Sequence, residues 1–112
     1  MDLANLKSER NEIKRFGGKP QPNSGRGATK KGDARLGPFV VDVKEYGKSY
    51  SISMDSWAKV NTDARTSGFY SPALNLVLGD PGKPRCRLWV IDNDMFMLML
   101  EAYQEKYGDE DE

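Results

Sequence analysis

A chain of 112 residues, 38% of them hydrophobic, is long enough for one domain with a modest core. No apolar run approaches the roughly 18 to 20 residues of a membrane span, and the first residues lack the basic-then-apolar layout of a signal peptide. The absence of histidine excludes Ser-His-Asp and Cys-His hydrolases and most zinc sites. The missing membrane span and signal-peptide layout lead us to expect an intracellular protein.

The formal net charge is zero, but the charges are unevenly distributed. The first fifty residues carry eleven basic and six acidic side chains, and the remainder carries six and eleven. A basic half favours a surface that binds polyanions, and ordinary surface charge is the alternative. Residues 109–112 form an acidic tail that we expect to be solvated and disordered.

The first predicted element is an amphipathic helix from Leu3 to Phe16, because apolar residues recur at helical spacing and Gly17 and Gly18 stop it. Glu9 lies close to the apolar stripe of this helix. A carboxylate on a packing face requires a partner or a metal ion. The alternative is a glutamate at the rim of the interface that pairs with a nearby lysine or arginine.

A loop is expected from Gly17 to Lys31, since this stretch is rich in glycine, proline and basic residues and has no apolar periodicity. Its spacing matches neither a Walker loop nor a dinucleotide-binding motif. A linker has a similar composition. A basic, glycine-containing loop is also suited to contact the phosphates of a nucleic acid.

A strand from Phe39 to Lys44 follows, and alternation places its odd-numbered and even-numbered side chains on opposite faces. Asp42 and Lys44 therefore project from the same face. Asp33 precedes the strand by a span short enough for a hairpin, which would bring it alongside Asp42. Two carboxylates and an ammonium group at a sheet edge could hold a divalent metal ion and place a cation beside a phosphate or a water.

The rest of the chain predicts two further helices and three further strands. Cys86 cannot form an internal disulfide and begins an apolar run, so we expect it to be a buried small hydrophobic residue. The elements are a short strand over Ser49–Ser53, a helix from Met54 to about Thr66 with Ser53 as its N-cap, strands over Ala73–Leu78 and Arg87–Ile91, and a helix from Met95 to about Tyr107. The expected fold is α/β, with a mixed sheet flanked by helices.

The last predicted helix is apolar most of the way round, because Met95 to Leu100 is an uninterrupted apolar run. Such a helix has to be buried on most sides. In a chain this short, a second copy of the chain is the natural cover, so we expect a homodimer formed through Met95 to Tyr107. A methionine-rich docking face for another protein is the alternative.

The chain resembles the PD-(D/E)XK nucleases, which have a restriction-endonuclease-like fold, and among them the archaeal-type Holliday junction resolvases and their phage relatives. The resemblance covers roughly residues 3 to 78 and makes residues 1–108 the nuclease domain. The matching pieces are Ser8-Glu9-Arg10, Asn23-Ser24-Gly25, Lys31-Gly32-Asp33, Val41-Asp42-Val43-Lys44 and Tyr50-Ser51-Ile52-Ser53. In two departures, Gly32 replaces the proline of the family motif, and Asp42 replaces the more frequent glutamate.

The resemblance implies a role for each matching residue. Asp33 and Asp42 would be metal ligands, with the backbone carbonyl of Val43 as a third. Lys44 would orient or deprotonate the attacking water, and Glu9 would complete the catalytic and metal site. The residues that would contact the DNA backbone are Ser24, Arg26, Lys30 and Lys31.

The implied activity is that of a Mg²⁺-dependent endonuclease, with Mn²⁺ as a substitute, that resolves four-way DNA junctions by symmetric phosphodiester hydrolysis. The implied setting is the cytoplasm of a prokaryotic or phage-infected cell. One alternative is a restriction-like, nicking or repair endonuclease of the same fold. The other is a non-catalytic nucleic-acid-binding module, in which Asp33, Asp42 and Lys44 form a structural cluster of ion pairs.

Overall fold

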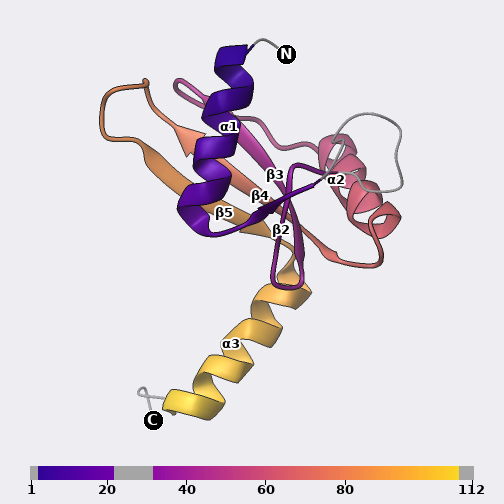
Figure 1. Ribbon diagram of the computed structural model, residues 1–112. Coiled ribbons are helices and arrows are strands. Elements are labelled where there is room, and N and C mark those ends of the chain that lie inside the picture. Colours follow the sequence, from indigo (N-terminus) through magenta and orange to yellow (C-terminus); the bar gives the residue numbers. More distant parts are fainter. Residues whose placement is uncertain (1–2, 22–31, 109–112) are drawn as a thin grey trace.

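The structure is a computed structural model that describes residues 3–21 and 32–108 of the chain. This part of the chain contains three helices and a five-stranded sheet (Figure 1). No helix in this described part is long and apolar enough to cross a membrane. In chain order the elements are α1 (Leu3–Phe16), β1 (Lys19–Pro20), β2 (Ala34–Leu36), β3 (Phe39–Tyr46), α2 (Met54–Thr66), β4 (Ser71–Leu78), β5 (Cys86–Ile91) and α3 (Asn93–Tyr107).

The strands follow the order β1-β2-β3-β4-β5 across a mixed sheet. β2 and β3 form an antiparallel hairpin in which Ala34 lies opposite Val41. β3 and β4 are parallel, so the chain must cross over between them, and α2 forms this crossover. β5 returns antiparallel to β4 and is one edge of the sheet. The protein therefore has an α/β fold with a mixed sheet, as expected.

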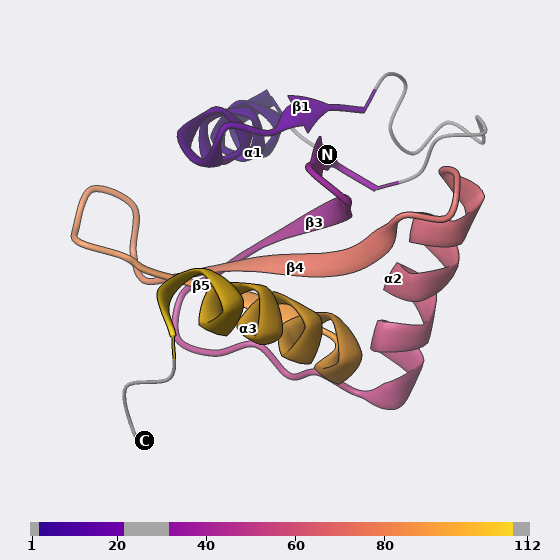
Figure 2. The same cartoon turned by 90° about the horizontal axis from the view of Figure 1, so that it is seen from below.

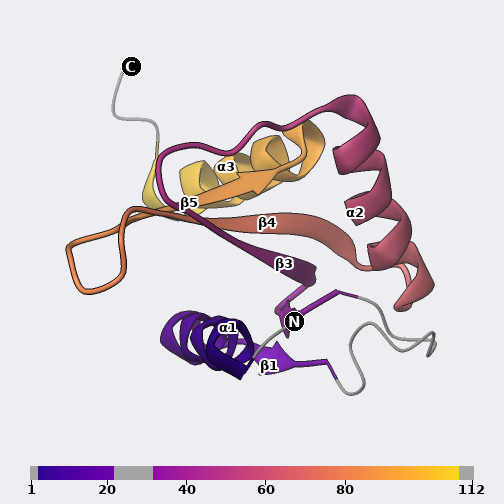
Figure 3. The same cartoon turned by 90° about the horizontal axis from the view of Figure 1, so that it is seen from above.

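Helices cover both faces of the sheet, with α1 on one face and α2 on the other (Figures 2 and 3). Beneath α1, Ile13 packs in a buried cluster that contains Val41 and Val43 of β3. Beneath α2, Val60 packs against Leu74 and Leu76 of β4. The odd-numbered side chains of β3 thus face α1, and the even-numbered ones face α2, which confirms the alternation predicted for this strand.

Polar contacts also hold α1 against the sheet. Arg87 of β5 donates to both carboxylate oxygens of Glu12, at 2.8 and 3.2 Å. One helical turn away, the Ser8 hydroxyl donates to Glu45 of β3 at 2.7 Å, and Arg85 donates to the same carboxylate oxygen. These contacts fix the rotation of α1 on both sides of Glu9.

Several predicted boundaries are confirmed. α1 and α2 span the predicted residues, and the Ser53 hydroxyl accepts from the Ser56 N–H as the predicted N-cap of α2. α3 begins two residues before the predicted Met95, at Asn93, because Asp92 caps it by accepting from the N–H of Met95 at 3.0 Å. β3 is two residues longer than predicted and ends at Tyr46, because Glu45 and Tyr46 continue the parallel pairing with β4.

Three predictions are wrong. Residues Ser49–Ser53 are not a strand: they carry the chain from β3 to α2, and Ile52 is 46% exposed. The stretch from Gly17 to Lys31, expected to be a loop, contains a short strand, β1, which pairs with β2. Cys86 is exposed, because it starts an edge strand whose first four residues are all exposed.

α3 packs little against the rest of the chain and extends away from the sheet (Figure 1). None of its residues is buried, although a helix with this composition was expected to be covered on most sides. Its large apolar side chains are 49% to 60% exposed at Phe96, Met97, Leu98, Met99, Tyr103 and Tyr107. The described residues of one chain thus leave this helix without a cover.

Candidate active site at the open edge of β3

The candidate site lies where β3 continues beyond the end of its hairpin partner. The backbone ladder between β2 and β3 closes with the N–H of Asp33, which donates to the carbonyl of Val41 at 2.9 Å. The next N–H on this edge of β3 belongs to Val43, and it donates to Oδ2 of Asp33 at 2.7 Å. A side-chain carboxylate therefore takes the place of the next backbone acceptor in the ladder.

Gly32 makes this position of Asp33 possible. Its φ of +87° lies in the region that glycine occupies readily, and a Cβ at this position would clash with Cγ1 of Val40. A proline, whose φ is fixed near −65°, could not adopt this conformation. Glycine at position 32 is therefore a structural requirement of this conformation.

Asp42 and Lys44 project toward α2, on the face of β3 opposite Val41 and Val43. Two charged side chains of α2, Lys59 and Asp63, act on Asp42 from across this face. The two residues are one helical turn apart, which places them on the same side of α2. The prediction that Asp42 and Lys44 share a face is confirmed.

Glu9 reaches the same site from α1. It shares a hydrogen bond with the carboxyl group of Asp33, and the charges of Asp42 and Lys44 also act on it. The structure thus brings together the four predicted catalytic side chains. The alternative considered for Glu9 was that it pairs with a lysine or arginine. In the structure, Glu12 makes such a pair: it is 4% exposed and is bound by Arg87.

The carboxyl groups of the site are held in an environment that favours their protonated forms. Burial, followed by repulsion from neighbouring carboxylates, raises the pKa of Asp33 to about 6 and that of Asp42 to about 6, against an ordinary value of 3.8. Burial also raises the pKa of Glu9, and Glu45 adds to this effect. Lys44 opposes the shift at each of the three carboxyl groups. Lys44 therefore offsets only part of the negative charge that gathers here at neutral pH.

The donor set suits a hard divalent cation. The backbone carbonyl of Val43 points to the same edge as its N–H, beyond the end of β2 and beside the Asp33 carboxylate. Carboxylate and carbonyl oxygens are the ligands that Mg²⁺ and Mn²⁺ prefer, and a cation would relieve the repulsion that raises these pKa values. Within residues 3–21 and 32–108, however, no three acidic, histidine or cysteine side chains are already arranged as a metal-binding group.

Sequence reasoning missed the outer charges of the site, which are Glu45, Lys59 and Asp63. Glu45 directly follows Lys44 in the sequence, and the four-residue spacing of Lys59 and Asp63 is the signal that could have placed them on one face of α2. The four predicted DNA contacts, Ser24, Arg26, Lys30 and Lys31, lie outside the described residues, as does the acidic tail over residues 109–112.

Comparisons of this chain with protein-family models, curated proteins and solved structures found no match. The interpretation of the site therefore depends on its residues and their geometry.

The raised pKa values predict how stability depends on pH in metal-free protein. Between about pH 4 and 6 the native state binds more protons than the unfolded state, so the free energy of unfolding falls as the pH rises through this window. We expect the protein in EDTA to be about 1 to 3 kcal/mol more stable at pH 5 than at pH 7.5, as measured by urea unfolding.

The variant Asp42→Asn should reduce this difference, because the amide carries no charge to titrate. Asp80→Asn, an exposed residue outside the carboxylate cluster, is the matched control and should leave the difference as it is in the parent. A parent protein that becomes more stable between pH 5 and 7.5 would contradict the assigned environment of Asp33 and Asp42.

Proposed function

We propose that this chain is a metal-dependent DNA endonuclease of the PD-(D/E)XK type that resolves four-way junctions. The observation that carries the proposal is the gathering of Glu9, Asp33, Asp42 and Lys44 at the open edge of β3. The elements that supply these residues, a helix and then a hairpin, have the order expected from the family resemblance. We also propose that the α/β fold of this chain is the restriction-endonuclease-like fold of these nucleases.

Asp33 and Asp42 would hold Mg²⁺ together with the carbonyl of Val43. The bound ion would supply positive charge at the scissile phosphate and a water of lowered pKa. Lys44 would orient the attacking water and stabilise the charge that develops on the phosphate. Glu9 would hold Asp33 in place through their shared hydrogen bond and complete the ring of carboxylates around the reacting centre.

Cleavage itself is the first test of the assignment. We expect Asp33→Asn and Lys44→Ala to slow the cutting of a labelled immobile four-way junction in Mg²⁺ by at least about 100-fold. Binding of the same junction in EDTA should change little, because phosphate contacts elsewhere provide most of the affinity. Lys48→Ala, in the exposed turn after β3, is the matched control.

If both variants cut the junction as fast as the parent, the site is wrongly assigned. Junction, duplex, flap and single-stranded DNA of equal length should be compared in the same assay. Preference for the junction supports a resolvase, and faster cutting of another substrate indicates a restriction-like, nicking or repair endonuclease.

Metal binding separates an enzyme from a non-catalytic module. Mg²⁺ or Mn²⁺ at 100 times its dissociation constant should stabilise the protein at pH 7.5 by about 2.7 kcal/mol, as measured by thermal unfolding. The effect should disappear in Asp42→Ala and persist in Asp80→Ala. Stability that is indifferent to both ions would favour a nucleic-acid-binding module, in which these residues only form ion pairs.

The proposed active form is a homodimer through α3. Two copies related by a two-fold axis would present two sites to two DNA backbones, as symmetric cleavage of a four-way junction requires. This proposal is supported by the exposure of Leu98 and Met99, which are 60% and 49% exposed on different sides of the helix. An apolar helix in water is unfavourable, and pairing would remove this surface from solvent.

Sedimentation at micromolar concentration tests the dimer. The double variant Leu98→Glu and Met99→Glu should sediment as a monomer, whereas the parent sediments as a dimer. The control makes the same chemical change at two exposed residues elsewhere, Ile52→Glu and Met54→Glu, and should leave the dimer intact. A parent that sediments as a monomer excludes this assembly.

A further inference from the structure

Phe69, just beyond the C-terminal end of α2, combines two unfavourable features. Its φ is +67°, in the left-handed region that a bulky side chain rarely occupies, and its side chain is 92% exposed. Among the residues that the structure describes, no other non-glycine residue has a positive φ. Strain in the backbone and a phenyl ring in water both reduce stability, so their coincidence points to a role outside the fold.

The fold does not require phenylalanine at this position. Phe69 donates its N–H to the carbonyl of Arg65 at the end of the helix, and a glycine or an asparagine could make the same bond with less strain. Gly68 beside it already takes a φ of +116°. The aromatic ring is therefore the part of this residue that packing and backbone geometry leave unexplained.

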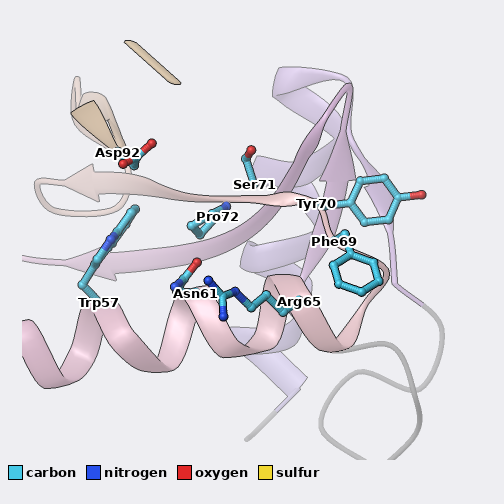
Figure 4. Close-up of a pocket in the computed structure, with 8 residues that line it drawn as sticks. All are labelled: Trp57, Asn61, Arg65, Phe69, Tyr70, Ser71, Pro72 and Asp92. Atoms are coloured by element: carbon cyan, nitrogen blue, oxygen red, sulfur yellow. The ribbon is translucent and has the colours of Figure 1, made fainter. Parts of the chain in front are cut away.

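Aromatic and cationic residues lie close to Phe69. Tyr70 lies next to it and is stacked by the guanidinium group of Arg35, whose Cζ is 3.8 Å from the centre of the tyrosine ring. The Arg65 side chain is exposed at the same end of α2. Figure 4 shows Phe69 and Tyr70 together at one end of a pocket, with Trp57 and Asp92 at the other.

This pocket has a volume of about 360 Å³, which lies within the range of sites for small ligands. Asp92 also lines it, but its Oδ2 accepts from the N–H of Met95 as the cap of α3. The surface near Phe69 thus offers ring faces together with arginine side chains. That combination suits a ligand that is both planar and anionic, as a nucleotide within a DNA strand is.

We infer that Phe69 is a stacking platform for an unpaired base of the DNA substrate, with Arg65 beside it for the adjoining phosphate. This inference rests on the proposed function and makes the substrate more specific. A base inside a duplex has both faces covered by its neighbours, so an exposed ring can stack only on a base at a branch point, an end or an unpaired position. Phe69 would thereby select branched DNA over a continuous duplex.

The platform lies beside α2, on the face of the sheet that also carries Asp42. Ser71, two residues after Phe69, pairs with Phe39 at the start of β3, and Asp42 follows about 10 Å further along that strand. A base held at Phe69 would thus keep the bound DNA on the face of the sheet that carries Asp42.

The test is a double-mutant cycle between Phe69 and the base. Two labelled four-way junctions are compared, one with an unpaired adenine at the branch point and one with an abasic nucleotide there, whose phosphates are the same. In EDTA, fluorescence anisotropy should show that the parent prefers the adenine by about 5- to 150-fold, since stacking on one base contributes ~1–3 kcal/mol. Phe69→Asn should bind both junctions equally.

Two controls keep the result interpretable. Asparagine tolerates a positive φ, so Phe69→Asn should unfold at a temperature no lower than the parent, and lost preference cannot then be attributed to a damaged fold. Phe69→Tyr retains an aromatic ring and should retain the preference for adenine.

If the parent and Phe69→Asn show the same preference for the adenine junction, the inference is wrong, and the ring would then contact a protein partner. Cleavage in Mg²⁺ separates this failure from failure of the proposed function. If Phe69→Asn and the parent both cut the junction but show no coupling to the base, the nuclease stands and the platform does not. If the coupling is present and the parent never cuts, Phe69 stacks on a base in a DNA-binding protein that is not a nuclease.

Discussion

One hydrogen bond, from the N–H of Val43 to Oδ2 of Asp33 at 2.7 Å, determines the geometry of the candidate site. Had β2 begun one or two residues earlier, a backbone carbonyl would have accepted this N–H, and the edge of β3 would be an ordinary ladder. Because β2 stops at this point, the edge of β3 is left to side chains and to the carbonyl of Val43. Acceptance of a backbone N–H lowers the pKa of the Asp33 carboxyl, but burial outweighs it and leaves the pKa at about 6. The sheet thus holds a carboxylate in place while its surroundings penalise its charge, a combination that favours exchange of a proton for a cation.

The second requirement is that α1 presents Glu9, and not another face, to this edge. Ser8 and Glu12 flank Glu9 on the helix, and each is tied to the sheet, Ser8 through Glu45 and Glu12 through Arg87. The Arg87 hydrogen bond keeps the pKa of Glu12 below its ordinary value, whereas burial raises that of Glu9. Glu9 and Glu12 lie one turn apart on the same helix, but their pKa values shift in opposite directions. Glu12 is a permanent anion that anchors the helix, and Glu9 is a carboxyl group whose charge depends on what binds beside it.

Local patterns in the sequence were sufficient for the centre of the site and insufficient for its surroundings. The alternation from Phe39 to Lys44 specifies the faces of β3, and the short span back to Asp33 permits only a tight hairpin, so both could be predicted. The strand assigned to Ser49–Ser53 failed because its composition suits a strand but the parallel pairing of β3 and β4 requires a crossover at this position. β1 was missed because two residues carry no periodicity, and only pairing with β2 makes Lys19 and Pro20 a strand. The exposure of Cys86 likewise follows from the position of β5 at the edge of the sheet, which an apolar run does not reveal.

The two exposed apolar features of this protein differ in physical character, and this difference bears on their roles. α3 is capped at both ends without strain and has large apolar residues on several sides. Its only unfavourable feature is the contact of these side chains with water. Contact with water is relieved by any complementary apolar surface of sufficient area, which a second α3 would provide. Phe69 is a single ring, too small to hold two proteins together, and covering it would leave its backbone strain in place. Such strain persists where the position of one side chain matters more than its cost, as at a point contact with a ligand. This difference supports the two proposals, that α3 forms an interface between subunits and that the ring of Phe69 contacts the substrate.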